Sequence, residues 1–365
     1  MSSLRKDEHL EIASLDVCEG PLTTWLEYVD PIHLAITEVD PDSVDTSVEF
    51  LGYKLSLPLV IAPITGGTRS AYEINKALAE VAYEKRIAVS LGSARPLIEN
   101  KANSEVLESF KIVRKIASDI PVIANIGAIQ LTIYGPEAAE RIVSVCEADA
   151  LSIHLNPLQE IAQPEGDKLR VGVVKAIART IEKLDVPIIV KEVGFGLSRE
   201  CTEVLRKLGV KMFDVAGAGG TNWLCIELVR RRLKGSEDEA LYTFLSWGIP
   251  TAAAIAEVRD AAPDAVVIAG GGIRTGLDVF KAIAIGADLA SIARPLVVAR
   301  DNQRIKRLID KIWKELRIAM ALTGCRSVDN VKSCPIVVRG NLAYWICARR
   351  LKPRNRNIYM FCIVR

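Results

Sequence analysis

From Leu57 onward, the chain alternates short apolar runs with longer stretches in which apolar residues recur at helical spacing. The short runs are rich in β-branched residues, and their apolar positions are continuous rather than interleaved with polar ones. This pattern is typical of strands that are buried on both faces, as in a parallel sheet. The strands are predicted at 58–63, 87–92, 121–127, 148–154, 186–192, 210–217, 265–272 and 287–294.

Helical patterns fill the segments between these strands, for example at 74–86 and 276–287. Eight strand–helix units predict an α/β fold of the (β/α)8 TIM-barrel type. A doubly wound open sheet is the alternative architecture. It is disfavoured because no Gly-x-Gly-x-x-Gly motif follows the first strand, where a dinucleotide-binding sheet would carry one.

The rest of the chain extends the barrel, which covers about 57–300. Residues 1–56 contain three prolines and predict an extended N-terminal arm that caps one end of the barrel. Residues 301–324 have the amphipathic pattern of a long helix. The tail after residue 341 mixes apolar and basic residues, which indicates a frayed or subunit-contacting end, with a membrane-surface role as the alternative. We interpret residues 1–365 as a single domain with a C-terminal helical extension.

Composition narrows the possible functions. Lys and Arg total 47 against 45 for Asp and Glu, so the net charge of +2 gives no basic excess of the kind that binds nucleic acid. No apolar run is long enough to span a membrane, and the N-terminus lacks the apolar stretch of a signal peptide. The eight cysteines include no Cys-x-x-Cys pair. We therefore expect neither a zinc site nor a disulfide framework, and a reducing cytoplasm is the simplest location.

Barrel enzymes place their chemistry at the carboxyl ends of the strands. Here the seventh strand ends in three consecutive glycines, and the helix that follows begins near Thr275, so this loop is a candidate phosphate site. A tight turn without a ligand is the alternative. Lys191 ends the fifth strand and needs an anionic partner, either Glu192 or a bound anionic cofactor. We favour the cofactor, because adjacent strand residues point to opposite faces.

The fourth predicted strand runs into the segment 152–167, SIHLNPLQEIAQPEGD, which is rich in groups that carry or bind protons. His154 closes the strand, and Pro157 keeps Asn156 out of the helical region. Gln159 and Glu160 are then expected in a turn above the barrel. Carboxylate and amide groups at this position suit a divalent cation or proton transfer.

Basic residues form a further candidate site. Arg5 and Lys6 lie on the polar arm with His9 close by, and Ser93 and Arg95 follow the second strand. An arm that closes over the barrel mouth could hold a diphosphate between these groups. Solvated surface charge is the simpler interpretation of Arg5 and Lys6 taken alone.

Nine segments, taken in chain order, resemble the type 2, flavin-dependent isopentenyl-diphosphate isomerase family: RKDEHLEI, ITGG, GSAR, ANIGAIQL, IHLNPLQEIAQPEGD, PIIVKEVGFG, DVAGAGGTNW, WGIPTAA and GGGIRTGLD. The resemblance implies reversible conversion of isopentenyl diphosphate to dimethylallyl diphosphate by a 1,3-proton shift. It also implies FMN in its reduced form, NADPH or NADH as the reductant, and Mg²⁺. The family tends to form homotetramers or larger symmetric homo-oligomers.

Carried over motif by motif, the resemblance implies three groups of site residues. The substrate would be bound by Arg5, Lys6, His9, Ser93, Arg95, Asn156 and Gln159. The catalytic residues would be His154, Gln159 and Glu160, with Glu160 also the ligand of Mg²⁺. FMN would contact Ile64, Thr65, Gly66, Ser93, Asn125, Lys191, Ala216, Thr221, Gly272, Ile273, Arg274, Ala293 and Arg294.

The sequence departs from the usual family pattern near the flavin. Ile64 stands where the family usually has methionine, and Ala216 stands where it often has serine. Ser291 replaces a common glycine, where it puts a side chain near the expected flavin phosphate, and Arg294 could add a charged phosphate contact. The nearest alternative function is an FMN-dependent TIM-barrel oxidoreductase. A non-catalytic flavin-binding protein and a flavin-free, Mg²⁺-dependent diphosphate enzyme are further alternatives.

Overall fold

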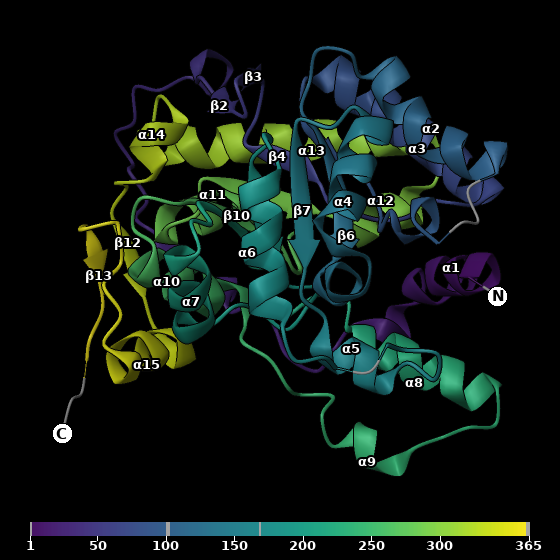
Figure 1. Ribbon diagram of the computed structural model, residues 1–365. Coiled ribbons are helices and arrows are strands. Elements are labelled where there is room, and N and C mark those ends of the chain that lie inside the picture. The colour runs from purple at the N-terminus through teal and green to yellow at the C-terminus, as the bar shows by residue number, and fades with distance from the viewer. Residues whose placement is uncertain (1, 100–102, 168, 363–365) are drawn as a thin grey trace.

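The computed structural model describes residues 2–99, 103–167 and 169–362, with side chains from residue 6 onward except at residue 17. Eight parallel strands close into a barrel (Figure 1). Each strand falls inside one of the eight predicted apolar runs, so the predicted (β/α)8 architecture is confirmed. The strands are β4 (Leu59–Ile61), β5 (Ala88–Ser90), β6 (Val122–Gly127), β7 (Ala150–His154), β8 (Ile188–Lys191), β9 (Met212–Asp214), β10 (Val266–Ala269) and β11 (Leu289–Ile292).

A helix follows each strand and packs on the outside of the barrel. These outer helices are α2 (Arg69–Lys85), α3 (Ser104–Ile116), α4 (Ala128–Cys146), α6 (Val173–Lys183), α7 (Arg199–Lys207), α10 (Thr251–Ala261), α11 (Gly276–Ile285) and α13 (Asn302–Leu322). The last of them is the long amphipathic helix predicted at 301–324. Further helices lie within the loops at the carboxyl ends of the strands: α5 (Pro157–Ala162), α8 (Trp223–Leu233), α9 (Glu239–Tyr242) and α12 (Arg294–Ala299).

The inside of the barrel is divided into an apolar and a polar layer. Because successive strand residues alternate between faces, residues two apart point to the same side. The apolar layer contains Val60, Ala88, Ile123, Ala150, Ile189, Ile268 and Leu289. Two positions closer to the carboxyl ends, the polar layer contains the buried residues Ser90, Asn125, Ser152, Lys191, Asp214 and Ser291. The strands therefore present polar groups only where they approach the loops that follow them.

The sequence predicted an extended N-terminal arm that caps one end of the barrel. The segment instead contains a helix and short strands, and it reaches both ends of the barrel. It begins with α1 (Ser2–Ala13), which packs against α8 (Figure 1). The buried side chains of Ile12 and Ile226 form this contact. After three short 3-10 turns and β1 (Val29–Pro31), it forms a hairpin of β2 (Val48–Phe50) and β3 (Tyr53–Leu55). Phe50 and Leu55 pack on the apolar layer and close the amino end of the barrel.

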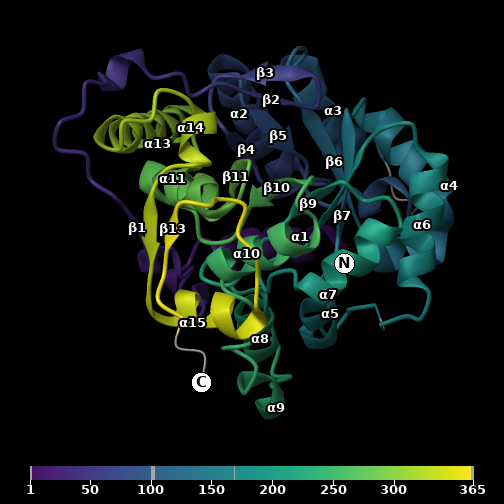
Figure 2. The ribbon, with the colours of Figure 1, turned by 90° about the vertical axis from the view of Figure 1, so that its left-hand side faces the viewer.

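The C-terminal segment contains α14 (Val328–Val331), β12 (Ile336–Val338), α15 (Gly340–Arg349) and β13 (Ile358–Tyr359). Strand β12 pairs with β1 on one side and β13 on the other, so the two ends of the chain share one small sheet (Figure 2). Cys347 and Cys362 form a disulfide, although the cysteine spacing predicted no disulfide framework. The two cysteines are 15 residues apart and meet because the chain returns past α15. A search for Cys-x-x-Cys spacing does not detect such a pair. Within the described residues, no helix is long and apolar enough to cross a membrane.

Candidate active site

A pocket lies at the carboxyl end of the barrel, and α1 forms part of its wall. All but two of the predicted site residues line it. Gly66 does not line the pocket. Its carbonyl accepts a hydrogen bond from Lys6, and a Cβ at this glycine would come within 2.3 Å of Phe110. The side chain of Arg5 lies outside the described residues. Sequence reasoning therefore located the pocket, although lining a pocket does not assign a role to any residue.

The loop after β7 brings the predicted catalytic groups together. Pro157 keeps Asn156 out of the helical region, as predicted, and itself begins α5, because the first helical position needs no N–H donor and tolerates proline. Gln159 and Glu160 consequently lie in a helix rather than a turn. The Nδ2 atom of Asn156 donates to Gln159 Oε1 at 3.1 Å and to Glu160 Oε1 at 3.0 Å. The residue that precedes α5 thus orients both side chains toward one point.

Glu160 is held in a partly desolvated position. Besides Asn156, the backbone N–H of Asp167 donates to its Oε2 at 2.8 Å. Burial raises the pKa of Glu160 above its usual value, although these two hydrogen bonds oppose the shift. A carboxyl group in this environment holds a proton more readily than an exposed one, and its remaining lone pairs can still bind a cation.

His154 ends β7 as a buried, neutral imidazole. Its Nδ1 lies 3.1 Å from Asn125 Oδ1, which requires the proton on Nδ1 and leaves Nε2 as an acceptor. Burial, together with the nearby Lys191, lowers the pKa of His154 to about 3. The ring therefore carries no positive charge near neutral pH.

Lys191 and Asp214 lie side by side in the polar layer, in register on β8 and β9. The Lys191 ammonium donates to the backbone carbonyl of Glu192. The Glu192 carboxylate instead accepts the N–H groups of residues 193–195, and of these two side chains only that of Lys191 lines the pocket. Burial raises the pKa of Asp214, against the opposing effect of Lys191. Asp214 was not predicted as a site residue. It lies two residues before the predicted site residue Ala216 in the DVAG motif, and strand residues two apart point to the same face, which could have indicated it.

The sequence predicted that the start of α11 would attract a phosphate, but its backbone N–H groups already have partners. The N–H groups of Arg274 and Thr275 already donate to Asp278, and that of Gly276 donates to Glu315. The first turn of α11 is therefore capped by its own chain. Attraction for a phosphate here would come from the preceding glycines and from the side chains of Arg274 and Arg294, which both line the pocket.

Acidic residues of the N-terminal segment hold both arginines. Arg274 pairs with Glu19 at 2.8 Å, and Arg294 pairs with Glu19 at 2.5 Å and Asp16 at 2.6 Å. Ser291 does not face these arginines. It lies in the polar layer with its Oγ 3.5 Å from Asp214 Oδ2, so the extra side chain that the sequence places near a phosphate points into the barrel instead.

Further basic groups line the pocket at the loops after β4 and β5. Lys6 of α1 donates to the carbonyl oxygens of Gly66 and, at 3.0 Å, Ser93, which joins α1 to the loops after β4 and β5. Arg95 pairs with Glu99 and, at 2.7 Å, with Asp167. Burial alone would lower the pKa of Arg95, but these carboxylates raise it, so the guanidinium remains charged.

The pocket suits a large ligand with polar and anionic groups. Thr65 lines the pocket, and its Oγ1 is a buried hydroxyl without a hydrogen-bond partner among the described residues. Buried polar groups are almost always hydrogen-bonded, so this atom indicates a bound partner. Asn125, Lys191 and the two arginines line the same pocket, and these donors fit the polar ring edge and phosphate of FMN.

Fold and pocket together define a TIM-barrel enzyme of the FMN-binding kind, and the family model described as FMN-dependent dehydrogenase matches residues 157–337. Solved mandelate oxidases share the fold: one with an FMN adduct has a TM-score of 0.63 over 91% of this chain and 92% of its own, at 18% identity. At that identity, the likeness concerns the fold alone.

Closer relatives identify the family. Isopentenyl-diphosphate delta-isomerase of Aeropyrum pernix is 44% identical over 97% of this chain and 94% of its own. The enzymes of the same name from Metallosphaera sedula and Ignicoccus hospitalis are each 41% identical over 95% of this chain, and cover 95% and 97% of their own lengths. The chain belongs to the isopentenyl-diphosphate delta-isomerase family, which confirms the resemblance found in the sequence.

Proposed function

We propose that this protein interconverts isopentenyl diphosphate and dimethylallyl diphosphate by a 1,3-proton shift, with reduced FMN and Mg²⁺. The main support is one arrangement in the pocket. The Asn156, Gln159 and Glu160 group lines the same pocket as the basic residues suited to a diphosphate and as Lys191, which suits a flavin. Substrate, metal and cofactor sites would then meet at one point.

In this proposal, Lys6, His9 and Arg95 bind the diphosphate. Arg95 is fixed by Glu99 and Asp167, so its guanidinium is held in place before the substrate arrives. Preorganised charges of this kind lose little entropy on binding. Arg5, Ser93, Asn156 and Gln159 would complete the substrate contacts, as the family resemblance implies.

Glu160 would hold Mg²⁺, which would supply positive charge for the diphosphate of the substrate. Within the described residues, no group of three or more His, Cys, Asp or Glu side chains could hold a metal alone. Mg²⁺ commonly takes one or two carboxylates and completes its shell with substrate phosphate oxygens and water. A site built on one glutamate therefore binds the metal together with the substrate.

FMN would be held by Thr65, Asn125, Lys191 and the glycine and arginine loops after β10 and β11. When bound in its reduced form, it supplies a fixed negative charge and exchangeable protons beside the alkene. The residues expected to contact it also include Ile64, Gly66, Ser93, Ala216, Thr221, Gly272, Ile273, Arg274, Ala293 and Arg294.

The chain's own residues suit a reaction through a cationic transition state. Gln159 and Glu160 would lie close to the reacting carbons, where a carboxyl with a raised pKa can exchange a proton. His154 contributes a neutral acceptor, because its pKa of about 3 prevents an imidazolium that would repel developing positive charge. Its role is to shape the charge of the site.

Three further parts of the proposal rest on the family resemblance. NADPH or NADH would reduce the flavin, the enzyme would act in the cytoplasm, and the subunits would form a homotetramer or a larger symmetric homo-oligomer. The alternative, an FMN-dependent oxidoreductase, is not favoured, because the relatives that match nearly the whole chain are isomerases.

The test is anaerobic incubation of the purified protein with isopentenyl diphosphate, FMN, NADPH and Mg²⁺, followed by measurement of dimethylallyl diphosphate. Parallel reactions omit flavin, reductant or metal. We expect product only when flavin and reductant are both present, without stoichiometric loss of NADPH. A flavin-loaded, reducible protein that forms no product would contradict the proposal.

A further inference from the structure

One face of α8 carries charged residues that the substrate and cofactor sites do not explain. Trp223, Glu227, Arg230 and Lys234 are spaced by four, three and four positions, so they share one side of the helix. This side faces α1 and α5, which pack against α8 (Figure 1). Glu227 is 0% exposed and Arg230 is 1% exposed. Buried charges of this kind need specific partners.

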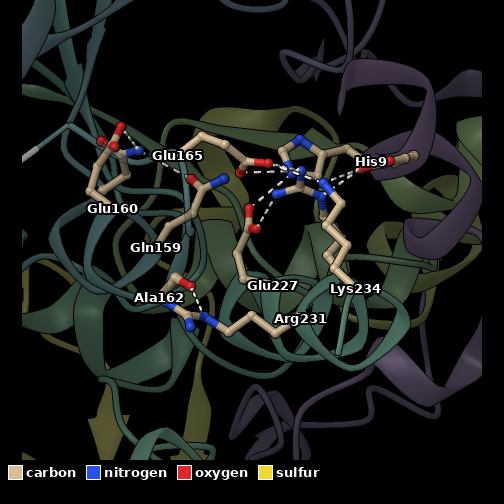
Figure 3. Close-up of polar contacts among 11 residues, drawn as sticks. His9, Gln159, Glu160, Ala162, Glu165, Glu227, Arg231 and Lys234 are labelled. Carbon is tan, nitrogen blue, oxygen red and sulfur yellow. Dashed lines mark hydrogen bonds and ion pairs between the residues drawn. The ribbon is translucent and has the colours of Figure 1, made fainter. Parts of the chain in front are cut away.

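Arg230 joins carboxylates from three segments. Its Nε donates to Glu8 of α1 at 3.0 Å, its Nη1 to Glu227 at 2.5 Å and its Nη2 to Glu165, after α5, at 3.3 Å. Lys234 adds contacts to Glu165 at 3.0 Å and to Glu8 at 3.4 Å. Figure 3 shows Glu165, Glu227 and Lys234 gathered between His9 on one side and Gln159 and Glu160 on the other.

His9 is the point at which this cluster reaches the pocket. Its Nε2 lies 2.8 Å from Glu227 Oε1, and its ring meets the Trp223 indole edge-on, with 5.3 Å between the ring centroids. His9 and Trp223 line the pocket, whereas Glu227 lies behind them and does not.

The charge of Glu227 decides which nitrogen of His9 carries a proton. Burial alone would raise the pKa of Glu227, but its contacts with His9 and Arg230 more than offset burial and lower it. An ionised carboxylate can only accept hydrogen bonds, so the Nε2 of His9 must donate. The imidazole is thereby fixed in both orientation and tautomer, as a carboxylate fixes a ligating histidine in many metal sites.

We propose that Glu227 is a positioning residue that orients His9 toward the substrate diphosphate, and that Arg230 holds Glu227 in place for this purpose. This inference rests on the proposed function, because it assigns Glu227 a part in binding the same substrate. It predicts that Glu227 acts only through His9. A merely structural role, the docking of α1 on α8, would not require that dependence.

A double-mutant cycle separates the two roles. The variants are Glu227→Gln, His9→Ala and their combination, with Glu237→Gln as the matched control, since Glu237 pairs with the exposed Arg232 on the same side of the molecule. We expect Glu227→Gln to raise KM for isopentenyl diphosphate about tenfold while kcat changes less than about twofold. In the His9→Ala background, the same change should have no further effect on KM. The control should match the parent enzyme.

Glu227→Asp gives a second variant if the amide disturbs folding. It keeps the charge for Arg230 but shortens the reach toward His9, so KM should rise while the melting temperature stays that of the parent. Equal effects of Glu227→Gln with and without His9, or a KM increase that always accompanies lower stability and flavin loss, would overturn the proposal.

The same double-mutant cycle of Glu227 and His9 can be measured without turnover. Calorimetric titration of the FMN-loaded variants with inorganic pyrophosphate and Mg²⁺ gives the binding affinity of each variant. If the parent protein forms no dimethylallyl diphosphate, the proposed function fails. The pyrophosphate affinities would still show whether Glu227 and His9 are coupled. Additive losses of affinity in that titration would overturn the inference whatever the outcome of the activity assay.

Discussion

The two layers inside the barrel come from the same strands but differ in chemistry. On β8, Ile189 belongs to the apolar layer and Lys191, two residues later, to the polar layer. Both side chains are buried, so burial alone does not separate structural from functional positions. The apolar layer stabilises the fold through packing. The polar layer buries groups that are costly to desolvate, and such groups persist where they serve a ligand.

The largest effect is expected for Lys191→Met. Removal of the ammonium should lower turnover by about a thousandfold, because a preorganised charge next to the flavin would be lost. The change also removes the cation beside the buried Asp214, so the melting temperature should fall as well. Turnover, the flavin absorbance of the purified protein and its melting temperature would test this. Full activity with flavin bound would remove Lys191 from the site.

Glu160→Gln tests the group beyond the end of β7. The amide keeps the shape but loses the charge for Mg²⁺ and the exchangeable proton, so turnover should fall by about a hundredfold. The dependence of the rate on Mg²⁺ should weaken, while FMN binding should stay unchanged. A rate with unaltered magnesium dependence would show that the metal binds elsewhere.

Ile189→Ala is the counterpart of Lys191→Met in the apolar layer. The lost methylenes and the resulting cavity should reduce the free energy of unfolding by about 2–5 kcal/mol. Turnover per folded molecule should remain near that of the parent. Denaturant unfolding and activity at a low temperature separate the two quantities. If Ile189→Ala abolished turnover while the protein stayed folded, the distinction between the layers would be wrong.

The smallest effect concerns Glu192, whose pKa is raised to about 7 by burial, against the hydrogen bonds from residues 193–195. Since the folded protein holds this proton more tightly than the unfolded chain does, stability falls as pH rises from about 4.5 to about 7. Glu192→Gln keeps an oxygen for the three N–H groups but cannot ionise. The difference in melting temperature between pH 5 and pH 8 should therefore shrink by a few degrees. Part of the pH dependence of stability should remain in this variant, because burial also raises the pKa of Asp214.

The sequence predicted the barrel because all eight strands are buried on both faces, which makes each apolar run continuous. It also located most of the pocket, because chemistry at strand ends follows directly from barrel topology. The prediction that residues 1–365 form one domain stays a prediction.

Other features depend on tertiary contacts. The segment of α1 is largely polar, with Ile12 its one fully buried side chain among those described, so docking on α8 rather than an apolar stripe stabilises the helix. Gln159 and Glu160 were expected in a turn, although both lie in α5, which begins at Pro157. The contact between His9 and Glu227 joins residues 218 positions apart, and no local pattern indicates it.

The most direct test of the account is to isomerise isopentenyl diphosphate in D₂O on enzyme whose FMN is already reduced, while the flavin absorbance is followed. The account predicts dimethylallyl diphosphate that carries deuterium, over many turnovers, with the flavin reduced throughout. Product without deuterium, or reoxidation of one flavin for each product formed, would contradict a proton shift and indicate a redox reaction instead.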